Sequence, residues 1–184
     1  MTDLSRSHVL MIATDGFEQS ELFDPRQALL DAGARVTLAS LKTDPITGEQ
    51  GGEKGKSITP DTTIDQVDPA DYDALVLPGG VANPDALRMN DRVVGIIRQV
   101  FDAGKPVAAI CHAPWLLVEA DVVKDRRVTS WPSIRTDLAN AGATVLDEEV
   151  VVDGNLITSR KPDDIPAFVE AIKKALTEAL EAVD

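Results

Sequence analysis

Residues 106–114 read Pro-Val-Ala-Ala-Ile-Cys-His-Ala-Pro, and this stretch decides the fold. Its first five residues are all apolar, which is typical of a strand buried inside a sheet. A short helix is predicted to follow, from Pro114 to about Ala120. The chain therefore bends sharply between a strand and a helix, and Cys111 lies at the bend.

Similar apolar runs alternate with helical patterns along the rest of the chain. Further strands are predicted at 8–13, 35–40 and 73–77, and helices at 18–32, 91–103 and 166–183. Gly33 and Gly104 stand just after the first two of these helices, where a glycine commonly ends a helix. Near-continuous apolar strands between helices are typical of a parallel sheet covered on both faces. We therefore expect an α/β fold, formed as one domain over residues 1–184.

Two segments depart from this pattern. Residues 150–158 hold an Asp-Gly pair between two apolar runs, which predicts a hairpin at the margin of the sheet. Residues 43–63 are rich in Gly, Pro, Asp and Lys, which predicts an exposed excursion with a hairpin as one option. Within it, residues 51–57 resemble a phosphate-binding loop, but Gln50 replaces the first glycine and Pro60 forbids the helix that should follow. A turn is the better interpretation.

Composition excludes several classes of function. The 184 residues carry a net charge of −13, with 18 basic residues against 31 acidic ones. Nucleic acid is bound by clustered Lys and Arg, so no nucleic-acid partner is expected. A single cysteine can form no intrachain disulfide, which fits a reducing compartment. The first apolar stretch is too short for a signal peptide or a membrane span. We therefore expect a soluble, cytoplasmic protein with no membrane partner.

Cys111 is the strongest candidate for chemistry. Ala109 and Ala113 flank it as in the small-x-nucleophile-x-small turn of hydrolases. Such a turn would present the sulfur at the carboxyl end of the sheet, where open α/β folds bind ligands. The helix that follows would favour a thiolate with a depressed pKa and could receive an oxyanion. The alternative is an inert core residue, because free cysteines are often buried.

His112 and two glutamates are the candidates for partners of the thiol. His112 could polarise its neighbour, because a strained bend need not keep adjacent side chains apart. With one cysteine and two histidines no zinc cluster is expected, and we predict no metal and no cofactor. Glu21 is explained by the preference for acids in the first turn of a helix. Glu18 follows the first strand at the sheet edge that carries the thiol, so its carboxyl group could reach the sulfur.

Several blocks of sequence together resemble the PfpI-like proteins of the DJ-1/PfpI superfamily. They keep the family's order and spacing over nearly the whole chain: Thr14-Asp-Gly-Phe-Glu-Gln-Ser-Glu-Leu22, Leu75-Val-Leu-Pro-Gly-Gly80, Ala109-Ile-Cys-His112, Val128-Thr-Ser-Trp-Pro132, Val151-Val-Asp-Gly-Asn155 and Thr158-Ser-Arg160. The resemblance implies a flavodoxin-like, doubly wound sandwich of the class I glutamine amidotransferase type. Its mostly parallel sheet would have helices on both faces.

The resemblance also implies roles for single residues. Cys111 corresponds to the nucleophile, His112 to its histidine partner and Glu18 to the glutamate beside the sulfur. The backbone donors near the thiol correspond to Gly79 or Gly80 and to the start of the helix after Cys111.

In PfpI-type members a carboxylate from a neighbouring subunit completes the catalytic set. It lies shortly after the Pro-Gly-Gly turn, and its counterpart here is Asp85. The segment is one residue longer than the archaeal pattern and carries Asp instead of Glu. The identity of the carboxylate that would complete the set with Cys111 and His112 therefore stays open. The resemblance implies a homo-oligomer, either a dimer or a hexamer.

Three functions follow from this set of residues. The first is a stress-related thiol hydrolase acting through Cys111 on small carbonyl adducts or glycated proteins, as a deglycase or a methylglyoxal-consuming glyoxalase. The second is an intracellular cysteine peptidase. The third is a non-catalytic redox-sensing or chaperone-like stress protein. A small pocket at the bend suits a small aldehyde better than an extended peptide, and His112 favours catalysis over a pure redox role.

Overall fold

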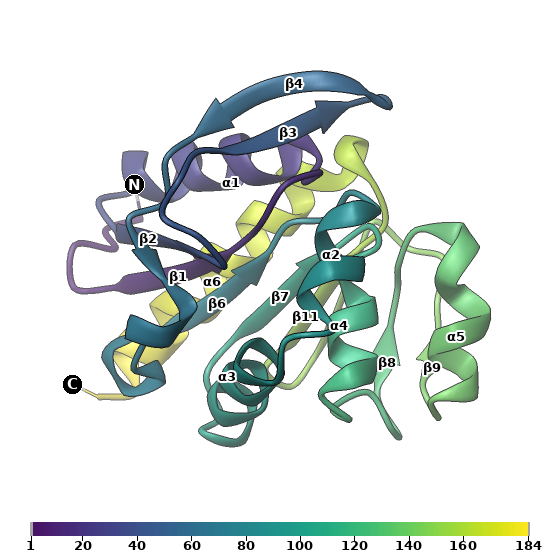
Figure 1. Cartoon of the computed structure of the whole chain (residues 1–184). Helices are drawn as coiled ribbons and strands as arrows, with labels where there is room; N and C mark the ends of the chain where they lie inside the picture. The colour runs from purple at the N-terminus through teal and green to yellow at the C-terminus, as the bar shows by residue number, and fades with distance from the viewer. Residues whose placement is uncertain (1, 184) are drawn as a thin grey trace.

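The computed structural model describes residues 2–183, so both ends of the expected 1–184 domain lie outside the described residues. Its centre is a seven-stranded sheet in the order β10-β11-β7-β6-β1-β2-β5 (Figure 1). Five neighbouring pairs are parallel, whereas β10 and β11 pair antiparallel at one edge. The strands are β1 (His8–Ile12), β2 (Arg35–Ser40), β5 (Thr62–Thr63), β6 (Ala74–Leu77), β7 (Val107–Ile110), β10 (Val150–Asp153) and β11 (Leu156–Ser159). The expected mostly parallel sheet is confirmed.

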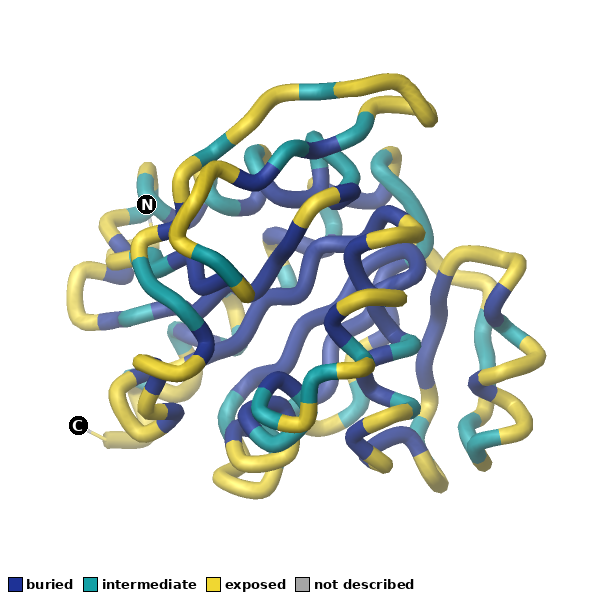
Figure 2. Tube along the Cα trace, in the orientation of Figure 1, coloured by how far each residue is buried: buried dark blue, intermediate teal, exposed yellow. Residues whose placement is uncertain are grey.

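Helices cover both faces of this sheet. One face packs against α1 (Gln19–Asp31) and α6 (Ile165–Glu181). The other packs against α2 (Ala82–Leu87), α3 (Asp91–Asp102), α4 (Pro114–Glu119) and α5 (Arg135–Asn140). Single 3-10 turns lie at Ile64–Gln66, Pro69–Asp71, Pro132–Ile134 and Pro162–Asp164. The doubly wound sandwich is therefore confirmed, with the strands buried between two helical layers (Figure 2).

The apolar sequence of β1 explains why both faces are covered. Side chains on a strand point alternately to opposite faces. Val9 and Met11 accordingly enter the core beneath α1 and α6, while Leu10 and Ile12 enter the core beneath α3 and α4. A strand with apolar residues on both faces is stable only where helices shield both, as in a parallel sheet.

Three smaller features complete the fold. Residues 150–159 form the expected hairpin at the sheet margin. The excursion at 43–63 contains a second hairpin, β3 (Ile46–Gln50) and β4 (Glu53–Ile58), which lies over α1 in Figure 1. Its turn is Gly51-Gly52, both with positive φ, so the turn interpretation of the phosphate-loop-like stretch is confirmed. The short strands β8 (Arg127–Val128) and β9 (Thr144–Val145) form a separate parallel pair.

The sheet topology creates one edge suited to a site. The chain passes from β1 through α1 to β2 on one side, whereas β6 and β7 lie on the other side of β1. Parallel α/β sheets bind ligands at the carboxyl ends of the strands, near such a reversal of strand order. Residues 13–18, 78–81 and 111–113 follow β1, β6 and β7 at this edge. Among residues 2–183 no helix is long and apolar enough to cross a bilayer.

Candidate active site

Cys111 sits on a strained turn between β7 and α4. Its φ of 67° lies in the left-handed region, which is unfavourable for a residue with a side chain. Such a conformation costs about 1–3 kcal/mol and persists only when the surroundings fix it. Here the Cys111 N–H donates to the Ser159 carbonyl at 3.0 Å, and the Trp131 N–H donates to the Cys111 carbonyl at 2.8 Å. The structure therefore holds the sulfur in the bend that the sequence predicted.

Glu21 supplies a buried carboxyl group beside the sulfur. Its side chain is fully buried, and Oε1 accepts a hydrogen bond from the Gly79 N–H at 3.1 Å. Oε2 is buried without a hydrogen-bond partner, and the carboxyl group lies close enough to Cys111 to change the pKa of the thiol. The expectation that Glu21 only serves the helix dipole was wrong, whereas contact of Glu18 with the sulfur stays a prediction.

The reason lies in where α1 begins. Glu18 is the N-cap, with an extended backbone, so its side chain does not follow the helical rotation. Glu21 lies inside the first turn on the same stripe as Pro25 and Leu29, which are both buried. This stripe is the sequence signal that could have identified Glu21, because a charged residue on a buried helical face requires a function or a partner. Glu18 instead lies half-buried in the wall of the pocket.

Burial controls the protonation of the group around the sulfur. Burial, with the negative charge of Glu18 added, raises the pKa of Glu21 to about 8. Burial also raises the pKa of the Cys111 thiol, and the charge of Glu21 raises it further when that carboxyl group ionises. The N–H groups of Gly80 and His112 favour the thiolate but do not outweigh these effects. The expectation of a depressed thiol pKa was wrong, because desolvation outweighs the helix start.

The imidazole of His112 completes the inner group. Its Nδ1 lies 3.2 Å from the Cys111 sulfur and its Nε2 lies 3.3 Å from the hydroxyl oxygen of Ser133. The ring is packed between Trp115 and Trp131, with centroid distances of 5.4 and 5.8 Å. Burial lowers the pKa of His112, so the ring is neutral near pH 7 and can accept a proton. Ser133, which the sequence did not single out, is the partner of the second ring nitrogen.

Gly79 and Gly80 bring a second strand end close to the thiol. A Cβ at Gly79 would lie 2.5 Å from Glu21 Oε1 and 2.7 Å from Cys111 Cβ, so only glycine fits between them. Because the Gly79 N–H is already bonded to Glu21, the Gly80 N–H is the one that faces the sulfur. Asn83 holds this loop, since its amide donates to the carbonyls of Pro78 (3.0 Å) and Gly79 (3.1 Å).

Asp85 lies away from the thiol within the chain. It is exposed on α2, and no described contact joins it to His112. A role for Asp85 in a neighbouring subunit stays a prediction.

The thiol opens into a cavity of about 510 Å³. It lies between the start of α1, the tip of the β3–β4 hairpin and the loops beyond β6, β7, β8 and β11. Its walls carry Glu18, Ser20, Glu21, Glu49, Gln50, Gly51, Gly52, Gly80, Val81, Cys111, His112, Trp131 and Pro162. Burial raises the pKa of Glu18, and the nearby charge of Glu49 raises it further. A hydrogen bond from the Gly51 backbone acts in the opposite direction but is a weaker effect than burial.

No group of three or more His, Cys, Asp or Glu residues within 2–183 is placed to hold a metal ion.

Comparison with known proteins agrees with this geometry. Deglycase TK1284 of Thermococcus kodakarensis is 45% identical over 168 residues, covering 91% of this chain and 98% of that protein. Protein/nucleic acid deglycase 2 of Escherichia coli is 45% identical over 162 residues, covering 87% and 92%. The crystal structure of Drosophila melanogaster DJ-1beta is 31% identical with a TM-score of 0.83, covering 96% and 97%. Residues 7–175 match the DJ-1/PfpI family as a whole, and the chain belongs to that family.

Proposed function

We propose that this chain is a cysteine-dependent hydrolase of small carbonyl adducts, acting as a deglycase or as a glyoxalase on methylglyoxal. One observation carries the proposal. The Cys111 thiol lines a cavity open to solvent and lies between a buried carboxyl group, Glu21, and a neutral imidazole, His112. A nucleophile flanked by a proton donor and a proton acceptor is the arrangement that attack on a carbonyl group requires.

The chemistry of methylglyoxal hydration can be written with these groups alone. The Cys111 sulfur attacks the aldehyde carbon, a C–S bond forms, and the thiol proton passes to His112 Nδ1. The aldehyde oxygen becomes an oxyanion near the N–H groups of Gly80 and His112. A proton then moves from the former aldehyde carbon to the ketone carbon, which oxidises the first and reduces the second, and the proton held by His112 passes to the ketone oxygen, which becomes the hydroxyl group of lactate. Water cleaves the resulting thioester, giving lactate and the free thiol with no outside oxidant or reductant.

A glycated amine can react at the same site. In an aminocarbinol the C–N bond breaks as the C–S bond forms, and the leaving amine takes up a proton. Glu21, which is protonated at neutral pH, is the donor closest to the sulfur. Two relatives carry the name deglycase, which supports this substrate class. The acidic cavity wall, with Glu18 and Glu49, suits an amine better than a nucleic-acid phosphate.

The working form is proposed to be a homo-oligomer in which Asp85 reaches His112 of a neighbouring subunit. Asp85 is exposed on α2, and Val81, four residues earlier in the chain, borders the cavity. Within one chain the outer nitrogen of the imidazole faces only a hydroxyl group, so a carboxylate from outside would strengthen it as a base.

The test measures lactate formed from methylglyoxal by the wild type and by the Cys111→Ser and Cys111→Ala variants. Free thiols consume methylglyoxal unaided, so loss of methylglyoxal alone is not a sufficient readout. We expect lactate formation to fall at least about 100-fold in both variants while circular dichroism and size-exclusion profiles stay unchanged. Lactate formation at the wild-type rate in Cys111→Ala would contradict the proposal.

An intracellular peptidase is the second candidate, since the same thiol and imidazole would serve it. The volume of the cavity, about 510 Å³, suits a small substrate better than an extended chain. Casein cleavage measured beside lactate formation separates the two. Cleavage that depends on Cys111 without lactate formation would replace the deglycase proposal by the peptidase.

A further inference from the structure

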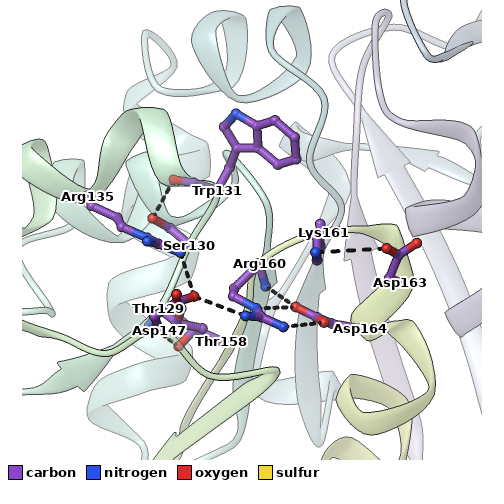
Figure 3. A network of polar contacts seen from close by, with 10 residues as sticks. All are labelled: Thr129, Ser130, Trp131, Arg135, Asp147, Thr158, Arg160, Lys161, Asp163 and Asp164. Carbon is purple, nitrogen blue, oxygen red and sulfur yellow. Dashed lines mark hydrogen bonds and ion pairs between the residues drawn. The ribbon is translucent and has the colours of Figure 1, made fainter.

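A second recess adjoins the thiol cavity on the other side of Trp131. It has a volume of about 290 Å³ and is lined by Trp131, Pro132, Arg135, Asp147, Arg160 and Lys161. Trp131 borders both spaces, and its backbone N–H donates to the Cys111 carbonyl at 2.8 Å. A ligand held in the thiol cavity can therefore extend past the indole ring into this recess, whose ion pairs are shown in Figure 3.

The recess differs in charge from the rest of the molecule. The protein carries 31 acidic and 18 basic residues, and the thiol cavity has three glutamates in its wall and no basic residue. Three basic side chains nevertheless meet in the neighbouring recess. The recess has three basic residues and one acidic residue, Asp147, in its wall, so a ligand that spans both spaces would meet acidic groups at one end and mainly basic groups at the other.

Arg160 has a structural role in this cluster. Its Nε and Nη2 donate to the two carboxyl oxygens of Asp164, at 2.9 and 3.0 Å, and its Nη1 donates to Asp147 at 3.0 Å. Asp164 is almost fully buried, so this fork-shaped pair fixes the start of α6 against β11. Arg160 thus has few donors left for a ligand.

Arg135 and Lys161, in contrast, have donors to spare. Arg135 donates through Nη2 to Asp147 at 2.8 Å, while its Nε is buried without any partner. Leaving a charged donor buried and unpaired is costly. Lys161 has one distant contact, with Asp163 at 3.9 Å, and its side chain is 41% exposed. Arg135 and Lys161 can therefore each bind a further anion while Arg160 keeps its hydrogen bonds to Asp147 and Asp164.

Asp147 shows what the recess accommodates. Its carboxylate bridges Arg135 and Arg160, at 2.8 and 3.0 Å, although its side chain is 65% exposed. It lies in the loop between β9 and β10, outside any helix or strand. A carboxylate of the chain itself therefore already occupies part of the recess, with its Oδ1 accepting one hydrogen bond from each of the two arginines.

We propose that this recess is a carboxylate-binding subsite, in which Arg135 and Lys161 bind the carboxylate of a substrate whose reactive adduct lies at Cys111. The substrate class is then a glycated amino acid or short peptide with a free carboxylate. The inference rests on the proposed function for the identity of the reactive end only. Asp147 and Asp163 neutralise part of the positive charge of the recess. The subsite is therefore expected to bind weakly on its own and to help select among substrates that the thiol cavity already binds.

The test uses binding and involves no turnover. Hippurate, an acylated glycine with a free carboxylate, is titrated into the wild-type protein beside hippuramide, which has the same shape without the charge. The chain has two tryptophans, so its ¹H–¹⁵N spectrum holds two indole signals. The Trp131 signal reports on the recess, and Trp115, whose Nε1 donates to Asp137 at 2.8 Å, serves as the internal control. Inorganic phosphate is titrated in a separate arm.

We expect hippurate to shift the Trp131 signal saturably and hippuramide to bind more weakly. Arg135→Gln and Lys161→Gln should each weaken hippurate binding about five-fold, the size of an exposed ion pair. Asp147→Asn should strengthen it, because a competing carboxylate is removed. Lys173→Gln, a change on α6 outside the recess, should leave it unchanged.

Equal binding of hippurate and hippuramide would overturn the proposal, as would wild-type affinity in Lys161→Gln. Tighter binding of phosphate than of hippurate would overturn the carboxylate assignment. Because no reaction is measured, failure of this subsite and failure of the deglycase proposal are separate results. If both hold, carboxylate-bearing adducts should have a lower KM than their amides, and Lys161→Gln should remove this advantage.

Discussion

Replacement of Glu21 by Gln should change how the stability of the protein depends on pH. The amide keeps the shape of the side chain and can still accept the Gly79 N–H bond, but it cannot ionise. The folded pKa of Glu21 is about 8, whereas the unperturbed value is 4.5. A carboxyl group with a raised folded pKa stabilises the fold fully below its unfolded pKa. This contribution is lost as the pH rises through the folded pKa.

The size of the effect follows from these two values. At about 1.4 kcal/mol for each pH unit, the gap between 4.5 and about 8 amounts to about 5 kcal/mol. The free energy of unfolding of Glu21→Gln minus that of the wild type should therefore rise between pH 4.5 and 8, by several kcal/mol and at most this amount. His112 titrates in part of the same range, but it is present in both proteins and cancels in the difference.

The assay is urea unfolding at one protein concentration and a series of pH values, followed by circular dichroism. Glu178→Gln, an exposed change on α6, is the matched control and should give a difference that does not vary with pH. Parallel stability profiles for the wild type and Glu21→Gln would refute the reasoning. They would mean that the buried carboxyl group ionises as readily in the folded protein as in the unfolded chain.

Three further predictions concern the surroundings of the thiol. Gly79→Ala should abolish turnover and lower the free energy of unfolding by about 1–3 kcal/mol, because the added Cβ would lie 2.5 Å from the buried carboxyl oxygen of Glu21. Gly95→Ala is the control, since no atom lies within 4 Å of the added carbon, and it should keep full activity and a normal melting temperature. Ser133→Ala should reduce kcat about five-fold by removing the partner of His112 Nε2, and an unchanged pH–rate profile would exclude this role. Asp85→Asn should lower turnover about ten-fold without changing the oligomer size, and full activity would remove Asp85 from the catalytic set.

The sequence predicted the central sheet well for a physical reason. Strands such as β1 and β7 are apolar on both faces, and only a doubly covered parallel sheet buries such strands. Of the short elements, α4 was predicted because it follows the bend at Cys111, whereas several others were not. The helices α2 and α5 have six residues each, and β5, β8 and β9 have two residues each. Segments of this length have no measurable period, and only tertiary contacts define them.

The sequence predicted the bend at Cys111 but not the buried carboxyl group of Glu21 beside it. The bend at Cys111 follows from local sequence, because small residues on both sides permit it. The choice between Glu18 and Glu21 depends on which residue begins α1, and helix boundaries are uncertain by one or two residues. Each residue turns a side chain by about 100°, so a small shift in the start decides which carboxyl group faces the sulfur.

The β3–β4 hairpin forms a wall of the cavity that is separate in the chain from the thiol and its carboxyl partner. Its base is fixed to the loop after β1, since the Gly16 N–H donates to the Thr47 carbonyl at 2.9 Å and the Glu49 N–H to the Phe17 carbonyl at 2.7 Å. Its tip, Gly51-Gly52, borders the cavity, yet a Cβ at either glycine would have no atom within 4 Å. Both glycines have positive φ, so a side chain at the tip strains the local backbone, but it would meet no atom of the thiol or of its carboxyl partner. A lineage can in this way acquire a new substrate while it keeps the old chemistry.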